Sequence, residues 1–412
     1  MKNQQNHRMQ HHLISPKSNP LELVFLLAMF TSIGALTIDL QLPAMPLILQ
    51  SFGLSEANKQ QWIITAYMFG FATAQIFYGP VADSVGRRPV LLFGLVLYTL
   101  ASLMCIFADS YVWFLAARVL QGVGAAACRI MVNTITRDFY AGNEMAKVTS
   151  LVMMIFIMVP VFAPSFGYLI MSMGVWQNIL YVYVGFGLLV LLWTFFRLPE
   201  SLSAENKRPL EMRRIKIAFI KVVREPVSMA FAVVSGIIFS GFMAYLNSAE
   251  QMYSDIYQVG HLFPYLFGVI ALFFGVAAFL NAKVVMKLGA LVVTRWALLI
   301  MVICNLLLLL VTLVFGGIPP LWFLVLMLII INICIGMAYG NLMAIAMYPL
   351  GKQAGMGSSV IGVVSAVLAS VLGILISQQL STTIYPVAIG FFVTSLLALF
   401  LVFKYSNRVV MH

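Results

Sequence analysis

Two charged side chains stand inside runs that are otherwise apolar, and they carry the clearest chemistry in the sequence. Asp39 lies within "SIGALTIDLQLPAMPLIL", and Arg118 opens "RVLQGVGAAACR", a segment that also supplies Gln121 as a candidate. A charge inside an apolar run usually faces a cavity or a partner. Burial disfavours the charged form of a carboxylate and a nearby guanidinium favours it. A change in the separation of Asp39 and Arg118 would therefore load and release a proton.

A comparison of depth puts both charges in the same half of a membrane. Asp39 lies 18 residues into its apolar run, about 27 Å from the start at 1.5 Å per residue. Arg118 lies 6 residues into a run of opposite direction, about 9 Å from its start. The two side chains can form a pair or share a water-filled pocket. The simpler alternative is a fixed ion pair that caps the first run.

The composition requires a membrane to hold these runs. Hydrophobic residues make up 62% of the 412 positions and charged residues 9%, far from the balance of soluble proteins. The runs are continuous rather than alternating, which indicates helices and excludes a barrel. The polar first 20 residues do not resemble a signal peptide, so the first span is expected to remain as an anchor. Twelve spans are predicted, at residues 21–46, 60–82, 90–108, 112–134, 146–173, 178–197, 227–250, 259–281, 291–314, 320–346, 355–380 and 384–404.

The basic residues fix an expected orientation. With both termini in the cytoplasm, 21 of the 24 Lys and Arg fall on the cytoplasmic side, the exceptions being Lys59, Arg118 and Arg129. This asymmetry follows the positive-inside rule. It also accounts for the net charge of +11, so nucleic acid is excluded as a partner.

One long polar connection divides the chain. We expect a cytoplasmic tail at 1–20, a six-helix bundle at 21–197, a basic cytoplasmic linker at 198–226, a second bundle at 227–404 and a cytoplasmic tail at 405–412. The turn "ADSVGRRPVLL" after the second span has a faded counterpart, "KVVMKLGALVV", after the eighth, which favours a transporter built from repeats. The linker is either an amphipathic helix on the membrane surface that meets lipids, or a connection whose charges only enforce topology.

The turn "GPVADSVGRRPVLL" is the sharpest motif in the chain. Gly79 allows helices to approach closely, and Gly86 allows a tight turn in which a Cβ would clash. Asp83, Arg87 and Arg88 supply paired charges.

This turn resembles the signature loop of the major facilitator superfamily. Together with "IDLQLPAMP" it looks like the Bcr/CflA branch of twelve-span drug:proton antiporters, over nearly the whole chain. The resemblance implies twelve transmembrane helices in two pseudo-symmetric six-helix bundles. It implies that Asp83 pairs with Arg87 and with Asp138, a cluster that would latch the cytoplasmic side of the halves. It also implies that protons and cationic substrates compete at Asp39, with Arg118 tied to that exchange.

Other residues allow two interpretations each. Arg129 stands 11 residues beyond Arg118, and is either a second cavity charge that favours anionic or zwitterionic substrates, or a side chain that snorkels to the cytoplasmic surface. Gly122 and Gly124 are expected to allow close helix packing. Glu250 departs from the family pattern, and is either a solvated rim residue or a second protonation site.

The fifth span holds Pro160, Pro164 and Gly167. This set resembles the antiporter motif of exporters but lacks its run of glycines, and a generic helix bend explains it equally well. Glu250 also has acidic and titratable neighbours in sequence, Asp255 and His261, at the outer ends of spans seven and eight.

No cluster has the spacing of a catalytic or metal site, and His7, His11 and His12 stand in a tail expected to be disordered. We therefore predict a transporter and not an enzyme, with no metal and no cofactor, driven by the proton motive force. The expected function is export of small, largely apolar drugs across the bacterial inner membrane. The expected partners are small-molecule substrates, protons and membrane lipids, and the expected state is a monomer. The alternatives are a dedicated transporter of one endogenous metabolite, such as a siderophore or peptide, and a receptor on the same scaffold.

Overall fold

The structure is a computed structural model that describes residues 20–140, 142–203, 205, 207 and 212–407. Within these residues all regular elements are helical and no strand occurs, as the composition predicts. The predictions for the N-terminal tail, including those for His7, His11 and His12, and for residues 408–412 lie outside the described part of the chain.

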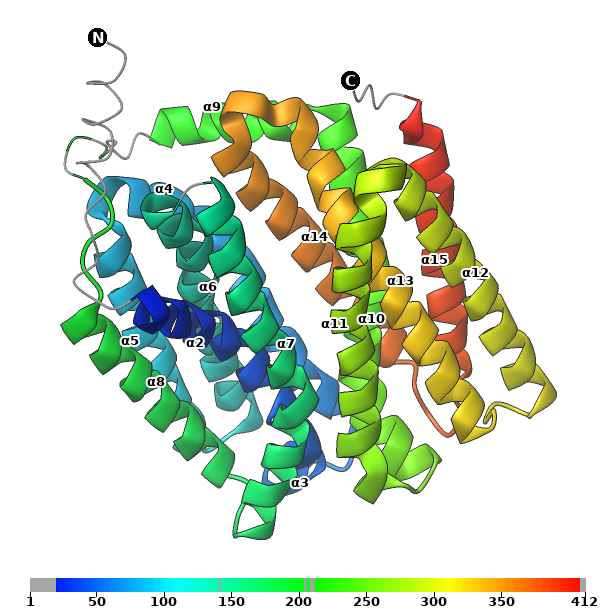
Figure 1. Ribbon diagram of the computed structural model, residues 1–412. Helices are drawn as coiled ribbons and strands as arrows, with labels where there is room; N and C mark the ends of the chain where they lie inside the picture. Colours follow the sequence, from blue (N-terminus) through cyan, green and yellow to red (C-terminus); the bar gives the residue numbers. More distant parts are fainter. Residues whose placement is uncertain (1–19, 141, 204, 206, 208–211, 408–412) are drawn as a thin grey trace.

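The helices fall into two bundles (Figure 1). The first contains α2 (Pro20–Asp39), η1 (Leu42–Ala44), α3 (Met45–Ser51), η2 (Ala57–Gln60), α4 (Gln61–Val85), α5 (Arg87–Ile106), α6 (Tyr111–Phe139), α7 (Gly142–Ser172) and α8 (Asn178–Arg197). The second contains α10 (Pro226–Gln251), the π-helical turn η4 (Met252–Ile256), η5 (Gly260–Leu262), α11 (Phe263–Leu288), α12 (Ala290–Val314), α13 (Leu321–Met347), η6 (Tyr348–Gln353), α14 (Ala354–Ser377) and α15 (Tyr385–Ser406).

Eleven segments of the described chain are long and apolar enough to cross a membrane. The remaining predicted span is α4, whose 25 residues reach about 37 Å at 1.5 Å per residue. This helix is less apolar because Gln61, Gln75 and Asp83 belong to it. The all-helical membrane fold predicted from the sequence is confirmed.

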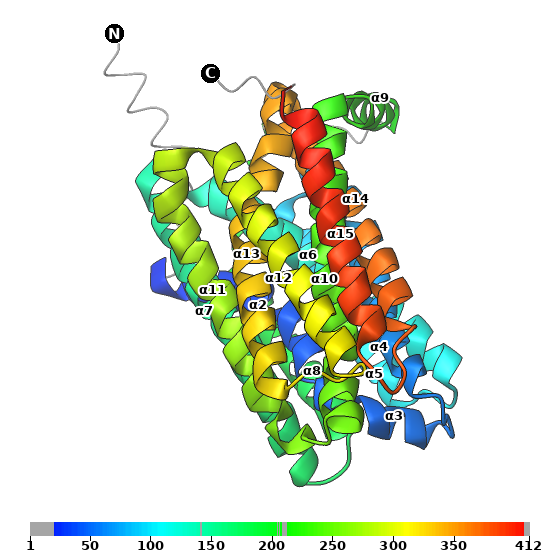
Figure 2. The ribbon, with the colours of Figure 1, turned by 90° about the vertical axis from the view of Figure 1, so that its right-hand side faces the viewer.

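The two bundles repeat one packing plan. In the first, α5 packs against α6 and α8; in the second, α12 packs against α13 and α15 in the same way. Between the bundles α4 packs against α14 and α7 against α11, and these two contacts correspond to each other when the bundles are exchanged. Figure 1 shows the bundles side by side, with α11 and α14 of the second next to the first, and Figure 2 views the molecule from the side of the second bundle. This arrangement is the pseudo-symmetry that the sequence repeat predicts.

The repeated turn is visible in the backbone. Gly86 joins α4 to α5 with φ 124°, and Gly289 joins α11 to α12 with φ 80°. Both values lie in the region that glycine adopts without strain. A Cβ at Gly86 would lie 2.5 Å from Oε2 of Glu200, so the clash predicted for a side chain at this turn is present.

Glycines bring α6 close to its neighbours. A Cβ at Gly122 would lie 2.0 Å from the carbonyl oxygen of Tyr67 in α4, and one at Gly124 would lie 2.5 Å from the backbone nitrogen of Tyr98 in α5. The close packing predicted for both glycines is therefore present, and it holds α6 against α4 and α5.

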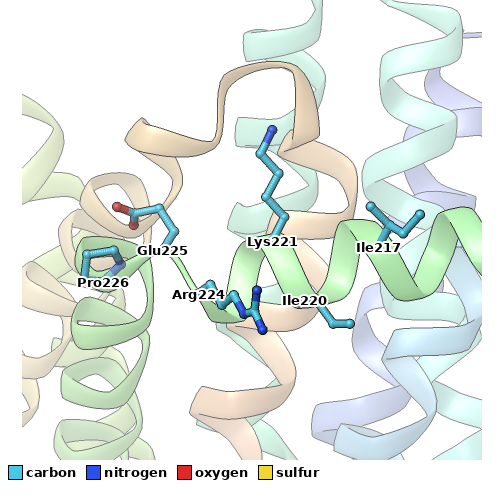
Figure 3. A pocket seen from close by; sticks show the side chains of 6 residues that line it. All are labelled: Ile217, Ile220, Lys221, Arg224, Glu225 and Pro226. Carbon is cyan, nitrogen blue, oxygen red and sulfur yellow. The ribbon is translucent and has the colours of Figure 1, made fainter.

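The linker forms a helix, α9 (Met212–Val223), along the top of the molecule in Figure 1, where it packs against α14 and α10. We call this end of the molecule the linker end and the opposite end the far end. Val222 is buried, whereas Phe219 and Val223 remain partly exposed. A shallow groove follows the junction of α9 and α10 and is lined by Ile217, Ile220, Lys221, Arg224, Glu225 and Pro226 (Figure 3).

Candidate functional site

Asp39 lies where the first membrane span is broken. The sequence predicts one continuous helix over 21–46, but α2 ends at Asp39 and the chain turns before η1 and α3 continue. The cause is Pro43, which has no amide to donate to the carbonyl of Asp39 and whose ring would clash with it in a continuous helix. The break places a carboxylate at a helix end inside the membrane rather than on a helix flank.

The Asp39 carboxylate is buried and unpaired. Its residue is 4% exposed, and no described residue forms a hydrogen bond or an ion pair with it. Two residues along the chain, both polar atoms of the Gln41 amide are buried without a hydrogen-bond partner in the described structure. Buried polar groups are usually paired with protein, water or ligand. The break in α2 therefore presents a carboxylate and an amide that are available to bind.

Asp39 has buried tyrosines of both bundles as electrostatic neighbours, Tyr183 of α8 in the first and Tyr245 of α10 in the second. Its carboxylate interacts electrostatically with the hydroxyl of Tyr245 in α10, a fully buried residue that in turn contacts the hydroxyl of Tyr253. The ring of Tyr245 stacks on that of Phe267 in α11, with 5.8 Å between centroids. A proton or cation at Asp39 would thus lie at the interface of the two bundles.

Arg118 does not pair with Asp39; it caps the end of α2. Its Nη2 donates to the carbonyl oxygen of Thr37 at 3.4 Å and its Nε to that of Ile63 at 3.4 Å. Nη1 donates to Oε1 of Gln121, and the guanidinium lies 4.9 Å from the ring centroid of Tyr67. A guanidinium at a helix C-terminus satisfies free carbonyls and complements the helix dipole. The fixed ion pair that the sequence allowed is therefore absent, and Arg118 positions the helix end that carries Asp39.

Buried hydroxyls complete this cap. Tyr183 of α8 donates to the Thr37 carbonyl at 3.1 Å, and the Thr37 hydroxyl lies 2.8 Å from that of Tyr98 in α5. Gln121 orients Arg118 and donates through Nε2 to Oγ of Ser102 at 2.7 Å. Five helices of the first bundle thus fix the geometry around the break. The sequence gives no signal for the tyrosines, because tyrosines are common in these spans.

A network of amides joins the two bundles at the far end. Asn58 donates to the carbonyl of Gln378 at 2.8 Å, and Gln61 donates to that of Ser377 at 2.9 Å and to Oε1 of Gln251 at 3.2 Å. Gln251 donates to Oδ1 of Asn58 at 2.9 Å, and Gln378 donates to Oε1 of Gln61 at 2.9 Å. We call Asn58, Gln61, Gln251 and Gln378 the far-end latch. It closes this end of the interface between the bundles, and sequence reasoning missed it.

Glu250 lies beside the latch. It is 7% exposed, accepts a hydrogen bond from Oγ of Ser254 at 2.7 Å, and interacts with Gln60 and with Asp255. Asp255 and His261 are exposed. The interpretation of Glu250 as a solvated rim residue is therefore wrong, because the π-helical turn after α10 folds over its side chain.

The charged motif forms a cluster at the linker end. Arg87 Nη1 lies 2.5 Å from Oδ1 of Asp83, and its Nε lies 3.3 Å from Oδ2 of Asp138. Ser201 also donates to Oδ2 of Asp138 at 2.7 Å. The pairing implied by the family resemblance is present. Its described partners all belong to the first bundle and the start of the linker, so this cluster braces one bundle and makes no described bridge to the other.

Glu200 is a member of this cluster that sequence reasoning missed. Its carboxylate accepts from the backbone amide of Arg87 at 2.9 Å and from that of Arg88 at 3.2 Å, which caps the N-terminus of α5. Arg88 itself donates to the carbonyl of Phe195 at 2.5 Å. An acidic residue in an otherwise basic linker was the available signal. At Gly79 a Cβ would lie 3.6 Å from Ser359, an ordinary contact, so this neighbour does not require a glycine there.

The residues singled out in the fifth span adjoin the break in α2. Pro160 and Pro164 lie inside α7, whose helix continues through both. A Cβ at Gly167 would lie 2.1 Å from the carbonyl oxygen of Leu40 and 3.1 Å from Cγ of Pro43. Gly167 therefore lets α7, which also contacts α11 of the other bundle, pack directly on the broken segment.

Comparison with known proteins decides the family. The family model described as "Major Facilitator Superfamily" matches residues 24–374. The chain belongs to the major facilitator superfamily. Its architecture agrees with a crystal structure of a bacterial homolog of the human lysosomal transporter Spinster in an inward-facing, occupied conformation, at a TM-score of 0.72 and 15% identity, over 95% of this chain and 98% of that one.

Curated relatives narrow the branch. The chain is 32% identical to the uncharacterized MFS-type transporter YdgK of Bacillus subtilis, over 92% of this chain and 93% of the relative. It is 28% identical to the bicyclomycin resistance protein homolog of Haemophilus influenzae, over 85% of this chain and 87% of the relative. It is 39% identical to the multidrug resistance protein MdtL of Klebsiella pneumoniae, over 40% of this chain and 42% of the relative. The resemblance to Bcr/CflA-type members of the superfamily is confirmed, and the chain is a multi-pass membrane transporter of small molecules.

Proposed function

We propose that this transporter exports small hydrophobic drugs in exchange for protons across the bacterial inner membrane. In this proposal both termini are cytoplasmic, the working unit is a monomer, and the proton motive force drives transport without a cofactor. One observation carries the proposal: a buried carboxylate, Asp39, without a described partner, at a break in a membrane helix and with electrostatic neighbours in both bundles. The names of the relatives, which refer to bicyclomycin and multidrug resistance, supply the substrate class.

The chemistry follows from the position of Asp39. A buried carboxylate without a counter-charge binds a proton readily, and water or a cationic substrate favours its release. Because Tyr245 of the second bundle is one of the electrostatic neighbours of Asp39, rocking of one bundle against the other would change the surroundings of the carboxylate. A drug and a proton would then occupy the site alternately, which couples their movements in opposite directions.

The two ends of the molecule have separate roles in this cycle. The far-end latch must open for release to the outside, since its hydrogen bonds join α4 to α10 and α14. The Asp83–Arg87–Asp138 cluster keeps the first bundle rigid while this happens. At the linker end, α9 presents Lys221 and Arg224 beside exposed apolar side chains, a surface suited to lipid head groups.

The test is proton movement in proteoliposomes with an acidic lumen. Addition of cationic, neutral and zwitterionic drugs should release lumenal protons through the wild type, and Asp39→Asn should abolish the release. The matched control is Asp109→Asn, which changes an exposed carboxylate and should leave the release unchanged. Size-exclusion profiles of all three proteins establish that they fold.

Two results would contradict the proposal. If no drug of the panel moves protons through the wild type, drug:proton exchange is wrong, and a narrow transporter or a receptor replaces it. If Asp39→Asn releases protons like the wild type, Asp39 is not the coupling site, and the buried Glu250 becomes the residue to change next.

A further inference from the structure

Arg129 is a second arginine on the face of α6 that carries Arg118. The two residues are 11 positions apart, about three helical turns and roughly 16 Å along the axis. Arg118 is fully buried. Arg129 is surrounded by protein yet partly accessible to solvent. A side chain that is both enclosed and accessible lines an internal cavity.

Arg129 has no ionic or hydrogen-bonding partner among the described residues. No carboxylate pairs with its guanidinium, and its electrostatic neighbour is the hydroxyl of Tyr339 in α13 of the other bundle. An unpaired charge inside a protein is costly and persists where it has a function. The arrangement therefore provides a binding group with its donors unused.

Arg129 lies about one helical turn before solvent-exposed positions of the same helix. Farther along α6 toward the linker end, Asn133 and Arg137 are exposed, so that part of the helix already reaches solvent. Arg129 instead stays enclosed and interacts with Tyr339 across the interface of the bundles.

Aromatic rings from the second bundle form the wall next to Tyr339. The ring of Tyr339 lies 4.9 Å from that of Phe239, which lies 5.0 Å from that of Phe242; Phe242 continues the row to Phe274 at 5.7 Å. Tyr339, Phe239 and Phe242 are all partly accessible. A flat apolar body can pack against this row.

We propose that Arg129 and the Tyr339–Phe239–Phe242 wall form a subsite for an aromatic carboxylate. The guanidinium would hold the carboxylate through two parallel hydrogen bonds, and the wall would hold the ring. This inference rests on the proposed function, because it assigns a substrate class to the same transport pathway. Zwitterionic compounds fit best, since Asp39 offers a carboxylate on the same proposed transport pathway.

The experiment compares two probes of equal shape, 2-naphthoate and the neutral 2-naphthamide, by calorimetric titration of the full chain in lipid nanodiscs. The wild type should bind the carboxylate roughly tenfold or more tightly than the amide, as expected for a charge-assisted hydrogen-bonded pair. Arg129→Gln should remove this preference, and Arg129→Lys should retain part of it. Arg137→Gln, which changes an exposed arginine of the same helix, should leave the preference intact.

The outcomes separate this subsite from the coupling mechanism. Equal binding of the two probes by the wild type, no binding of 2-naphthoate, or an unchanged preference in Arg129→Gln would overturn the subsite. Loss of binding in Arg129→Gln together with retention in Arg129→Lys supports it. A carboxylate preference that persists in a wild type without drug-driven proton release leaves the subsite standing while the export proposal fails.

Discussion

Arg118 and Arg129 are the same residue type on the same face of the same helix, and their surroundings give them opposite characters. Arg118 donates to two backbone carbonyls and one amide, and an aromatic ring covers its guanidinium. Among the residues that the structure describes, Arg129 has the Tyr339 hydroxyl as its electrostatic neighbour and no hydrogen-bond or ion-pair partner. A buried guanidinium that is bonded to acceptors of the protein stabilises the fold, whereas one without such partners has donors free to bind a ligand. The difference comes from partners on other helices.

The largest effect is expected when each arginine is replaced by a neutral side chain of similar length. Arg118→Met removes the guanidinium donors from the Thr37 and Ile63 carbonyls and from the Gln121 amide, with Tyr183 still donating to Thr37, and should cost roughly 3 kcal/mol of stability. Arg129→Met removes an unpaired charge and should leave stability equal or higher. Thermal melting of the purified proteins in detergent checks both. Equal losses of thermal stability in the two variants would mean that the two arginines contribute equally to the stability of the fold.

A smaller effect is expected from Gln121→Leu, which removes one partner from Arg118. The guanidinium keeps its two carbonyls but loses an acceptor, and Ser102 loses a donor, so the cost should be roughly 1–3 kcal/mol. Melting of the double variant with Arg118→Met should show much less than the sum of the two losses, because the residues act as one unit. Additive losses would separate Gln121 from the cap.

The converse change gives Arg129 a partner. Tyr339→Glu places a carboxylate opposite the guanidinium, and the new pair should occupy the group that would otherwise hold a ligand. Binding of 2-naphthoate should fall about tenfold, measured by the titration described above. The double variant with Arg129→Gln serves as the control, since it should show no further loss. Undiminished binding in Tyr339→Glu would place the carboxylate subsite elsewhere.

The smallest effect is expected from Tyr339→Phe. The ring stays in the aromatic wall and only the hydroxyl beside Arg129 is lost, so 2-naphthoate binding should weaken by about threefold, and binding of the amide should not change. A loss as large as that of Arg129→Gln would show that the hydroxyl, rather than the guanidinium, recognises the carboxylate.

Much of the fold could be predicted because lipid imposes strong rules on sequence. Continuous apolar runs predicted the helices, the polar linker predicted two bundles, and the local spacing of Asp83 and Arg87 predicted a turn with paired charges. The Asp138 partner came from family resemblance. These features depend on residues close in sequence or on a recurring motif.

The rest depended on contacts between distant segments. Pro43 was visible, but the helix end that it creates at Asp39 could not be placed without knowing that Arg118 and Tyr183 cap it. Depth along the spans put Asp39 and Arg118 in one half of the membrane. Depth does not specify in which direction a side chain leaves its helix, however, and the two side chains do not pair. The far-end latch joins Asn58 to Gln378 across 320 positions, and amides at the ends of spans carry no pattern that marks them.

The chemistry of that latch has a consequence for how the molecule meets its surroundings. Carboxamides neither titrate nor carry a net charge, so dissolved ions do not screen them as they screen surface ion pairs. The hydrogen bonds that close the far end are therefore expected to depend little on ionic strength or on pH between acid and neutral values. At this end of the interface, protons therefore act on side chains beside the latch, such as Glu250, and not on the latch itself.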